Sequence, residues 1–206
     1  ATAMMPMNGR SGTVGPNVGI TAAVPAGSSQ LLLADTAGLV SGGFIALRDP
    51  SQPHYGTSTN QIAGVEGEVC RIASVDSPTQ ITIQGATEEA YAIGSNIRKL
   101  TLVEGIHVHD VAFEDISSAA DPTLRARVCQ AHQTLRMRWE RVTMRGFSSD
   151  GIRGEFMVDF RFDDLTFEDF ANGSGYGVQA RKGSSGLVTG AVMRNGRHLF
   201  TTGDDP

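Results

Sequence analysis

Several features that mark large classes of protein are scarce in this sequence of 206 residues. The only two cysteines, Cys70 and Cys129, are too few for a disulfide framework, and each lies in an apolar stretch where a buried thiol is expected. No apolar run approaches the roughly 20 residues that span a bilayer, so membrane insertion is not expected. The net charge of −5 provides no basic surface for nucleic acid.

Glycine, in contrast, is abundant. The 25 glycines and a charged fraction of only 19% favour a turn-rich β protein over a helical one. The hydrophobic fraction of 40% is that of a globular chain that is long enough to bury a core.

One short pattern occurs four times, as VAFEDI, VTMRGF, LTFEDF and AVMRNG. Its third residue is Phe113, Met144, Phe167 or Met193, and apolar residues stand two and five positions earlier in each copy. The pattern predicts one continuous core made of Val108, Val111, Phe113, Trp139, Val142, Met144, Phe162, Leu165, Phe167 and Met193.

The apolar positions alternate with a period of two, except where two consecutive polar residues interrupt each copy. This indicates two strands joined by a bend. A third strand precedes each of the last three copies, and Val128, Ile152 and Val178 align in it. Three strands repeated about every 25 residues predict an all-β fold, a single-stranded parallel β-helix with one coil per repeat.

Charged residues support the same register. One column of outward positions reads Glu114, Arg145, Glu168, Arg194, and acidic and basic side chains alternate along it. Equivalent residues of adjacent coils lie about 4.8 Å apart, where opposite charges attract.

The chain divides into three parts by pattern. Residues 1–27 have no periodicity and are expected to form an irregular N-terminal arm. Short β-type runs over 28–102 predict a small antiparallel β subdomain, with 49–66 as a surface loop. Residues 103–206 carry the coils, and we expect them to be truncated at the C-terminal end, as part of a longer protein.

A resemblance to a known group of proteins rests on the segment GEVCRIASVDSPTQITIQG and on the later EGIHVHDVAFEDI and GRHLFTTG. These stretches resemble bacteriophage tail-associated proteins, tailspikes and tail fibres, in which a small β subdomain interrupts a β-helix. Coils of this type resemble the right-handed β-helix of the pectate-lyase superfamily. The resemblance implies a place in the phage tail of the virion, a homotrimer, and contact with other tail proteins and host surface polysaccharide. It does not decide the chemistry, because this fold carries enzymes and adhesive proteins alike.

The best catalytic candidates are outward carboxylates of neighbouring coils. Glu140 and Asp163 share one column, and Asp110 and Asp164 stand beside them. Carboxylates about 5 Å apart suit retaining glycoside hydrolysis. The alternative is that they are solvated bend residues paired with Arg141.

His107 and His109 lie on one face of a strand and could chelate a metal, but Arg138 aligns beside His107 and disfavours a cation there. No cofactor and no metal is therefore expected.

Two functions remain open: a structural or receptor-contacting segment of a phage tail fibre or tailspike, and a polysaccharide depolymerase, either a hydrolase or a lyase. Paired charges and subunit contacts would favour the first, and convergent carboxylates beside exposed aromatic residues the second.

Overall fold

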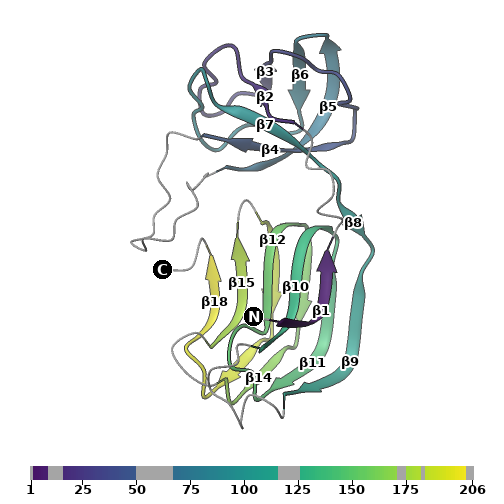
Figure 1. The fold of residues 1–206 in the computed structure, drawn as a ribbon, viewed down its shortest axis with the longest axis vertical. Coiled ribbons are helices and arrows are strands. Elements are labelled where there is room, and N and C mark those ends of the chain that lie inside the picture. Colours follow the sequence, from purple (N-terminus) through teal and green to yellow (C-terminus); the bar gives the residue numbers. More distant parts are fainter. Residues whose placement is uncertain are drawn as a thin grey trace. The chain divides into compact units, whose positions relative to one another are not determined.

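The structure, a computed structural model, describes residues 2–8, 16–49, 67–115, 126–170, 175–181 and 184–202. Every regular element among them is a β-strand, as the sequence predicts. The chain forms two compact units (Figure 1). One contains Ala1–Ser11 and Leu102–Gly203, and the other contains Gly12–Thr101.

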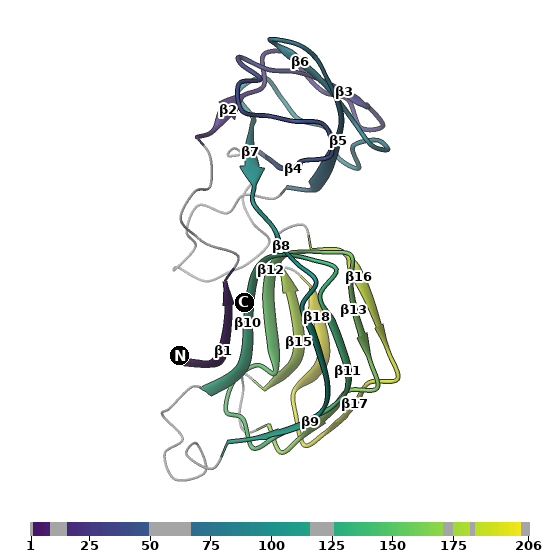
Figure 2. The ribbon, with the colours of Figure 1, turned by 90° about the vertical axis from the view of Figure 1, so that its right-hand side faces the viewer.

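The first unit consists of two parallel sheets, each with its strands side by side (Figure 2). The β10 sheet has the order β1-β10-β12-β15-β18, with β8 also paired to β10. Its strands are β1 (Thr2–Asn8), β8 (Val103–Glu104), β10 (Ala126–Leu135), β12 (Ile152–Val158), β15 (Tyr176–Arg181) and β18 (His198–Thr202).

The β11 sheet has the order β16-β13-β11-β14-β17, with β9 also paired to β11. Its strands are β9 (His107–Glu114), β11 (Arg138–Arg145), β13 (Phe160–Asp163), β14 (Thr166–Glu168), β16 (Gly186–Thr189) and β17 (Val192–Arg194). Each coil contributes strands to both sheets, which is the arrangement of a parallel β-helix.

The register within the β11 sheet is the predicted one. Met144 pairs with Phe113 on one side and Phe167 on the other, and Phe167 pairs with Met193. The side chains of this column and of the Trp139 column fill the space between the sheets. All ten residues of the predicted core belong to this one cluster, fully buried or packed against it.

The predicted alignment of Val128 with Ile152 is wrong by one residue. Cys129 pairs with Ile152, and Ile152 pairs with Val178. Val128 and Cys129 are both fully buried, so two consecutive side chains are enclosed here and the period of two fails to mark the pairing residue.

The bends of the coils have a conformational cause that repeats from coil to coil. Asp110, Arg141 and Asp164 adopt left-handed φ values of 52°, 50° and 52°, and Gly190 follows in the next coil with 63°. These residues lie directly after the paired column of His109, Glu140, Asp163 and Thr189. A left-handed residue turns the strand without ending the pairing on either side, and this explains the interruption of the alternation.

A second column of left-handed residues follows the ends of β11, β14 and β17. Gly146, Asp169 and Asn195 have φ values of 78°, 55° and 55°. Glycine, aspartate and asparagine are the residues that adopt this conformation most readily. The Asn195 side-chain amide also donates to Asp169 Oδ1 at 2.8 Å, so adjacent corners are hydrogen-bonded.

The N-terminal residues differ from the predicted irregular arm, because β1 is a strand of the β10 sheet. It pairs in parallel with β10 up to Asn8 opposite His132, and β8 resumes the pairing at Val103 opposite Thr134. The partner lies more than a hundred residues away, so no local periodicity announces this strand. Pro6, which cannot donate to a ladder, is tolerated because β1 is at the sheet edge.

Only Gln133 separates the two pairing segments on β10, and its φ is 53°. The second unit is therefore inserted into one strand of the first coil, at a position where the next coil has a left-handed bulge. Its two attachment points are adjacent along the β10 strand.

The second unit contains a sheet of order β2-β7-β4-β5-β6-β3, in which the strands pair antiparallel. The strands are β2 (Val18–Gly19), β3 (Gln30–Leu32), β4 (Phe44–Arg48), β5 (Val69–Ser77), β6 (Gln80–Ile83) and β7 (Asn96–Leu100). A separate cluster that includes Leu31, Ile45, Ile72 and Ile97 forms its core. Most of the predicted 49–66 loop lies outside the described residues.

The central ring of the coil core provides a test of the packing. Phe167 is fully buried, its ring stands edge-on to Phe170 at 5.7 Å between centroids, and Gly151 and Gly177 lie against it. Phe167→Ala should lower the free energy of unfolding by about 3–5 kcal/mol, because it leaves a cavity. Arg138→Ala, at an exposed position of β11, should change it by less than about 0.5 kcal/mol in the same denaturant titration. Equal effects would contradict the assigned core.

The insertion point predicts that the coils fold without the second unit. A chain in which one glycine replaces residues 9–102 should unfold cooperatively, with a β-type circular dichroism spectrum, because glycine can occupy the left-handed position opposite Gln133. Direct fusion of Asn8 to Val103 is the matched control. It shifts the pairing by one residue, exposes the wrong face and should destabilise the product. Equal stability of the two chains would refute the assigned register.

Candidate functional site

The four predicted carboxylates lie together on the outer face of the β11 sheet. Glu140 pairs with Asp163 in the adjacent coil, as predicted. Asp110 and Asp164 occupy the neighbouring bend column, on either side of Arg141. The structure therefore brings the four residues into one patch, at the turn that the left-handed residues produce.

Arg141 holds two of these carboxylates. Its Nε lies 2.5 Å from Asp110 Oδ1 and its Nη2 lies 2.7 Å from Asp110 Oδ2, and Nη1 also donates to Glu140. His109 Nδ1 is 2.9 Å from Asp110 Oδ2. Hydrogen bonds from Arg141 and His109 hold the pKa of Asp110 well below its usual value.

The carboxylate of Asp163 also accepts two hydrogen bonds. The Thr189 hydroxyl donates to Oδ1, and Arg161 Nε donates to Oδ2 at 2.7 Å. These two hydrogen bonds, that from Thr189 first, lower the pKa of Asp163. Asp164 is one of the left-handed residues that form the bend. Gly190 is the next residue of this column, and a Cβ built there would collide with the Asp164 carboxylate.

The two histidines predicted to share a face do so. Their ring centroids are 4.7 Å apart, and His107 Nε2 lies 3.6 Å from Glu140 Oε2. Among the residues that the structure describes, no group of three or more histidine, cysteine or acidic side chains is placed to hold a metal ion.

The predicted column of alternating charges is also present. Arg145 Nη2 lies 2.6 Å from Glu168 Oε2, and Arg194 Nη1 lies 3.2 Å from Glu168 Oε1. Both arginines are exposed, so each pair contributes well under about 1 kcal/mol to stability. The pairs fix which residues stand opposite each other between coils more than they strengthen the fold.

Glycoside hydrolysis needs two carboxyl groups in different protonation states. A general acid needs a carboxyl group whose pKa is raised so that it is protonated near neutral pH. Here the pKa values of Asp110 and Asp163 are lowered by hydrogen-bonded partners. Asp110 and Asp163 are therefore suited to pairing charges between coils, and their lowered pKa values do not favour the role of general acid.

Sequence reasoning overlooked the outer face of the β10 sheet. Cys129, Ala131, Ile152, Val178 and Ala180 belong to the core, so the residues between them point outward. The outward residues form two columns by the strand register, Gln130–Arg153–Gln179 and His132–Glu155–Arg181. In the sequence, polar residues alternate with small or apolar ones in QAHQ (130–133), IRGEF (152–156) and VQAR (178–181). This alternation could have indicated the outer face.

These polar groups contact one another. Gln130 Nε2 lies 2.8 Å from His132 Nε2, and His132 Nδ1 lies 3.5 Å from Glu155 Oε2. Beside them, the Asp150 carboxylate lies 3.5 Å from Arg127 Nη2 and 3.8 Å from Arg153 Nη1. We call Arg127, Gln130, His132, Asp150, Arg153, Glu155, Gln179 and Arg181 the β10-face cluster.

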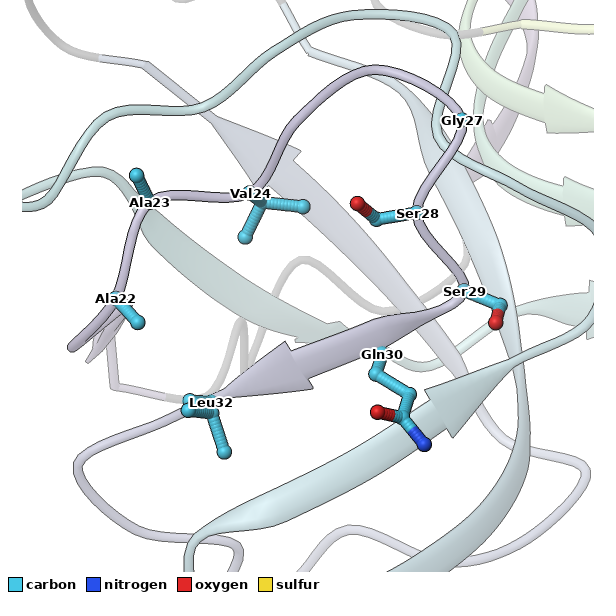
Figure 3. Close-up of a pocket in the computed structure, with 8 residues that line it drawn as sticks. All are labelled: Ala22, Ala23, Val24, Gly27, Ser28, Ser29, Gln30 and Leu32. Carbon is cyan, nitrogen blue, oxygen red and sulfur yellow. The ribbon is translucent and has the colours of Figure 1, made fainter.

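The second unit has a shallow pocket of about 470 Å³, shown in Figure 3. It is lined by one stretch of chain from Ala22 to Leu32, which includes Val24, Ser28 and Gln30. The lining contains no charged or imidazole side chain, so it offers no acid, base or metal ligand.

Both cysteines are buried thiols, as the sequence predicts. Burial raises the pKa of both Cys70 and Cys129 to about 12, with a contribution from Glu68 and Glu88 at Cys70. No helix among the described residues is long and apolar enough to cross a membrane.

Comparison with known proteins identifies the fold. No protein family model matches the sequence, and no curated protein is similar to it in sequence. The structure is similar to the tailspike protein gp49 of Pseudomonas phage LKA1, with a TM-score of 0.70 and 20% identity over 93% of this chain. It is also similar to the tailspike gp61 of Pseudomonas phage phi297, with a TM-score of 0.67 and 13% identity over 94% of this chain.

In both comparisons this chain spans 32% of the length of the tailspike that it matches. The matched share of this chain is larger than either unit, so the similarity extends over both units. The chain therefore has the fold found in phage tailspike proteins, a parallel β-helix together with a small antiparallel β unit.

Proposed function

We propose that this chain is a structural and receptor-contacting segment of a bacteriophage tailspike or tail fibre, and that it touches host surface polysaccharide. The observation that carries the proposal is the fold, which two phage tailspikes share over 93% and 94% of this chain. Location in the phage tail of the virion, next to other tail proteins, is part of the same proposal.

A parallel β-helix suits such a role for a physical reason. Each coil is hydrogen-bonded to the next along its strands, and the core side chains stack in continuous columns. The resulting rod resists bending, because any bend must break ladder hydrogen bonds or open the close-packed core. A rigid rod can transmit force and can present one face to an extended polymer.

We propose further that the segment works as a homotrimer. Leu187, Val192 and Phe200 are large apolar residues exposed on β16, β17 and β18. Exposed apolar side chains of this size favour contact with another protein surface. In sedimentation equilibrium the protein should have three times the mass of one chain. A monomer across the accessible concentration range would contradict this part of the proposal.

The alternative function, a polysaccharide depolymerase that uses Glu140 and Asp163, makes a distinct prediction about protonation. Because the pKa of Asp163 is lowered and that of Asp110 more strongly so, both carboxyl groups should titrate below the ordinary value of 3.8. Carbon-13 NMR of the side-chain carboxyl groups measures this directly. A titration midpoint near 6 for any of the four carboxylates would identify a general acid and favour the depolymerase.

The same shifts give a stability prediction with a definite sign. A folded-state pKa below the unfolded value contributes stability that is present above the unfolded pKa and is lost as the pH falls through the folded pKa. Arg141→Gln removes the main cause of the Asp110 shift, so it should weaken the dependence of stability on pH below about pH 4. Denaturant titrations at several pH values compare it with the wild type. An unchanged pH dependence would show that the Asp110–Arg141 pair is not formed in solution.

The functional test is binding without cleavage. The protein is incubated with a panel of bacterial capsular and O-antigen polysaccharides, and both bound polysaccharide and newly formed chain ends are measured. We expect binding to at least one polysaccharide, no new reducing or unsaturated ends, and no effect of Glu140→Gln or Asp163→Asn. Cleavage that these two substitutions abolish would establish the depolymerase, and no binding at all would overturn the proposal.

A further inference from the structure

The two sheets of the coils end at different strand positions. In the β10 sheet the positions are β1 with β8, then β10, β12, β15 and finally β18. In the β11 sheet they are β9, β11, β13 with β14, and finally β16 with β17. Because β18 follows β16 and β17 in the chain, it lies one position beyond them. Among the described strands, none pairs with the outer edges of β16 and β17.

The side chains at this end are apolar and incompletely covered. Phe167 is fully buried, but Met193, which pairs with it in the last position of the β11 sheet, is only half-buried. In the β10 sheet, Val178 is fully buried, but Phe200, which pairs with it, is 42% exposed. The inward columns of both sheets therefore end in exposed apolar surface. We call the following residues the end notch: Val188, Met193, Arg194 and Phe200.

Two columns of the β11 sheet alternate from coil to coil, and the alternation predicts what fits the notch. An aromatic residue followed by a carboxylate takes turns with a methionine followed by an arginine. The four pairs are Phe113–Glu114, Met144–Arg145, Phe167–Glu168 and Met193–Arg194. The strand that continues this order carries an aromatic residue followed by a carboxylate.

The charges give this order a physical reason. Arg145 stands between Glu114 and Glu168 in the register, and Glu168 in turn contacts both Arg145, at 2.6 Å, and Arg194, at 3.2 Å. Arg194 is the last member of the column that the structure describes, so it has an acidic neighbour on one side only, and its side chain is 71% exposed. Opposite charges on adjacent strands attract and like charges repel. The notch therefore favours a strand with a carboxylate opposite Arg194.

The apolar column has a similar preference. Met144 lies between Phe113 and Phe167, whereas Met193 has a phenylalanine on one side only in the described part of the chain. A thioether makes favourable contacts with aromatic rings, and it adapts its shape to them. An aromatic side chain on the added strand would restore at Met193 the surroundings that Met144 has.

The backbone at the corner also lacks its next partner. The Gly146 N–H donates to the Glu168 carbonyl and the Asp169 N–H donates to the Arg194 carbonyl, each at 3.0 Å. Asn195 is the equivalent residue of the last position, and among the described residues no carbonyl accepts from its N–H. A strand added in the same register would supply that carbonyl.

We propose that the end notch is a docking site for one extended strand of a partner protein. The strand adds in parallel to the outer edges of β16 and β17, places an aromatic side chain on Met193 and sets a carboxylate opposite Arg194. Strand addition of this kind derives affinity from backbone hydrogen bonds and selectivity from alternate side chains. The site lies at the end of the coils and does not depend on polysaccharide contact.

A peptide of residues 160–170, FRFDDLTFEDF, is the probe, because this segment occupies the equivalent place on β11. Its fluorescence anisotropy is measured as the intact protein is added. We expect saturable binding, with an affinity at least about threefold higher than that of the same peptide with Glu168→Arg. Arg194→Glu in the protein should reverse this preference. Lys99→Glu, at an exposed position of the second unit, makes the same change in net charge and should leave the preference unchanged.

Amide hydrogen exchange locates the bound peptide, and thermal unfolding checks that each variant is folded. Binding should slow exchange at Asn195 and in β17. Equal binding of the two peptides, or protection of β9 instead of β17, would overturn the assignment. If neither peptide binds and Arg194→Glu lowers the mass of an oligomer, a second copy of the chain covers the notch and the proposed partner is wrong. Absence of binding with an unchanged mass also refutes the proposal. Polysaccharide binding is measured separately, so the proposed function stands or fails independently of these results.

Discussion

The stacking of equivalent residues in adjacent coils is the constraint on which the rest of this structure depends. Each strand pairs in parallel and in register with its counterpart in the next coil, so a residue at one position meets the same position again. Core columns, charge columns and bend columns all follow from this rule. Gly146, Asp169 and Asn195 stand in one column because each corner needs the same left-handed backbone.

The short pattern that occurs four times made much of the fold predictable. Phe113, Met144, Phe167 and Met193 fix the register of the β11 sheet, and the polar pairs before them mark the bend. These positions were readable because burial and backbone conformation constrain residue type in every coil. The pairing of β1 was not predictable, because nothing local in residues 2–8 reveals a partner at residues 126–132. The pairing of Cys129, rather than Val128, with Ile152 was missed because both residues are fully buried.

The candidate site shows the limits of the same reasoning. Placement of Glu140, Asp163, Asp110 and Asp164 in one patch follows from register alone. Pairing with Arg141 was one of two interpretations that the sequence left open, and the structure shows it for Asp110. The hydrogen bonds from Arg161 and Thr189 to Asp163 could not be read from the sequence. The β10-face cluster was missed for the opposite reason. Its residues alternate with core residues as any outward residues do, and their low exposure cannot be read from sequence.

The register of the β11 sheet carries the central claim, because the core, the bends and the charge column all depend on it. The most direct measurement is a crystal structure of the protein. The account predicts Met144 between Phe113 and Phe167 inside the coils, with Arg141 between Asp110 and Asp164 in the bend column. A register shifted by one residue, with Phe113 or Phe167 on the outer face, would contradict it.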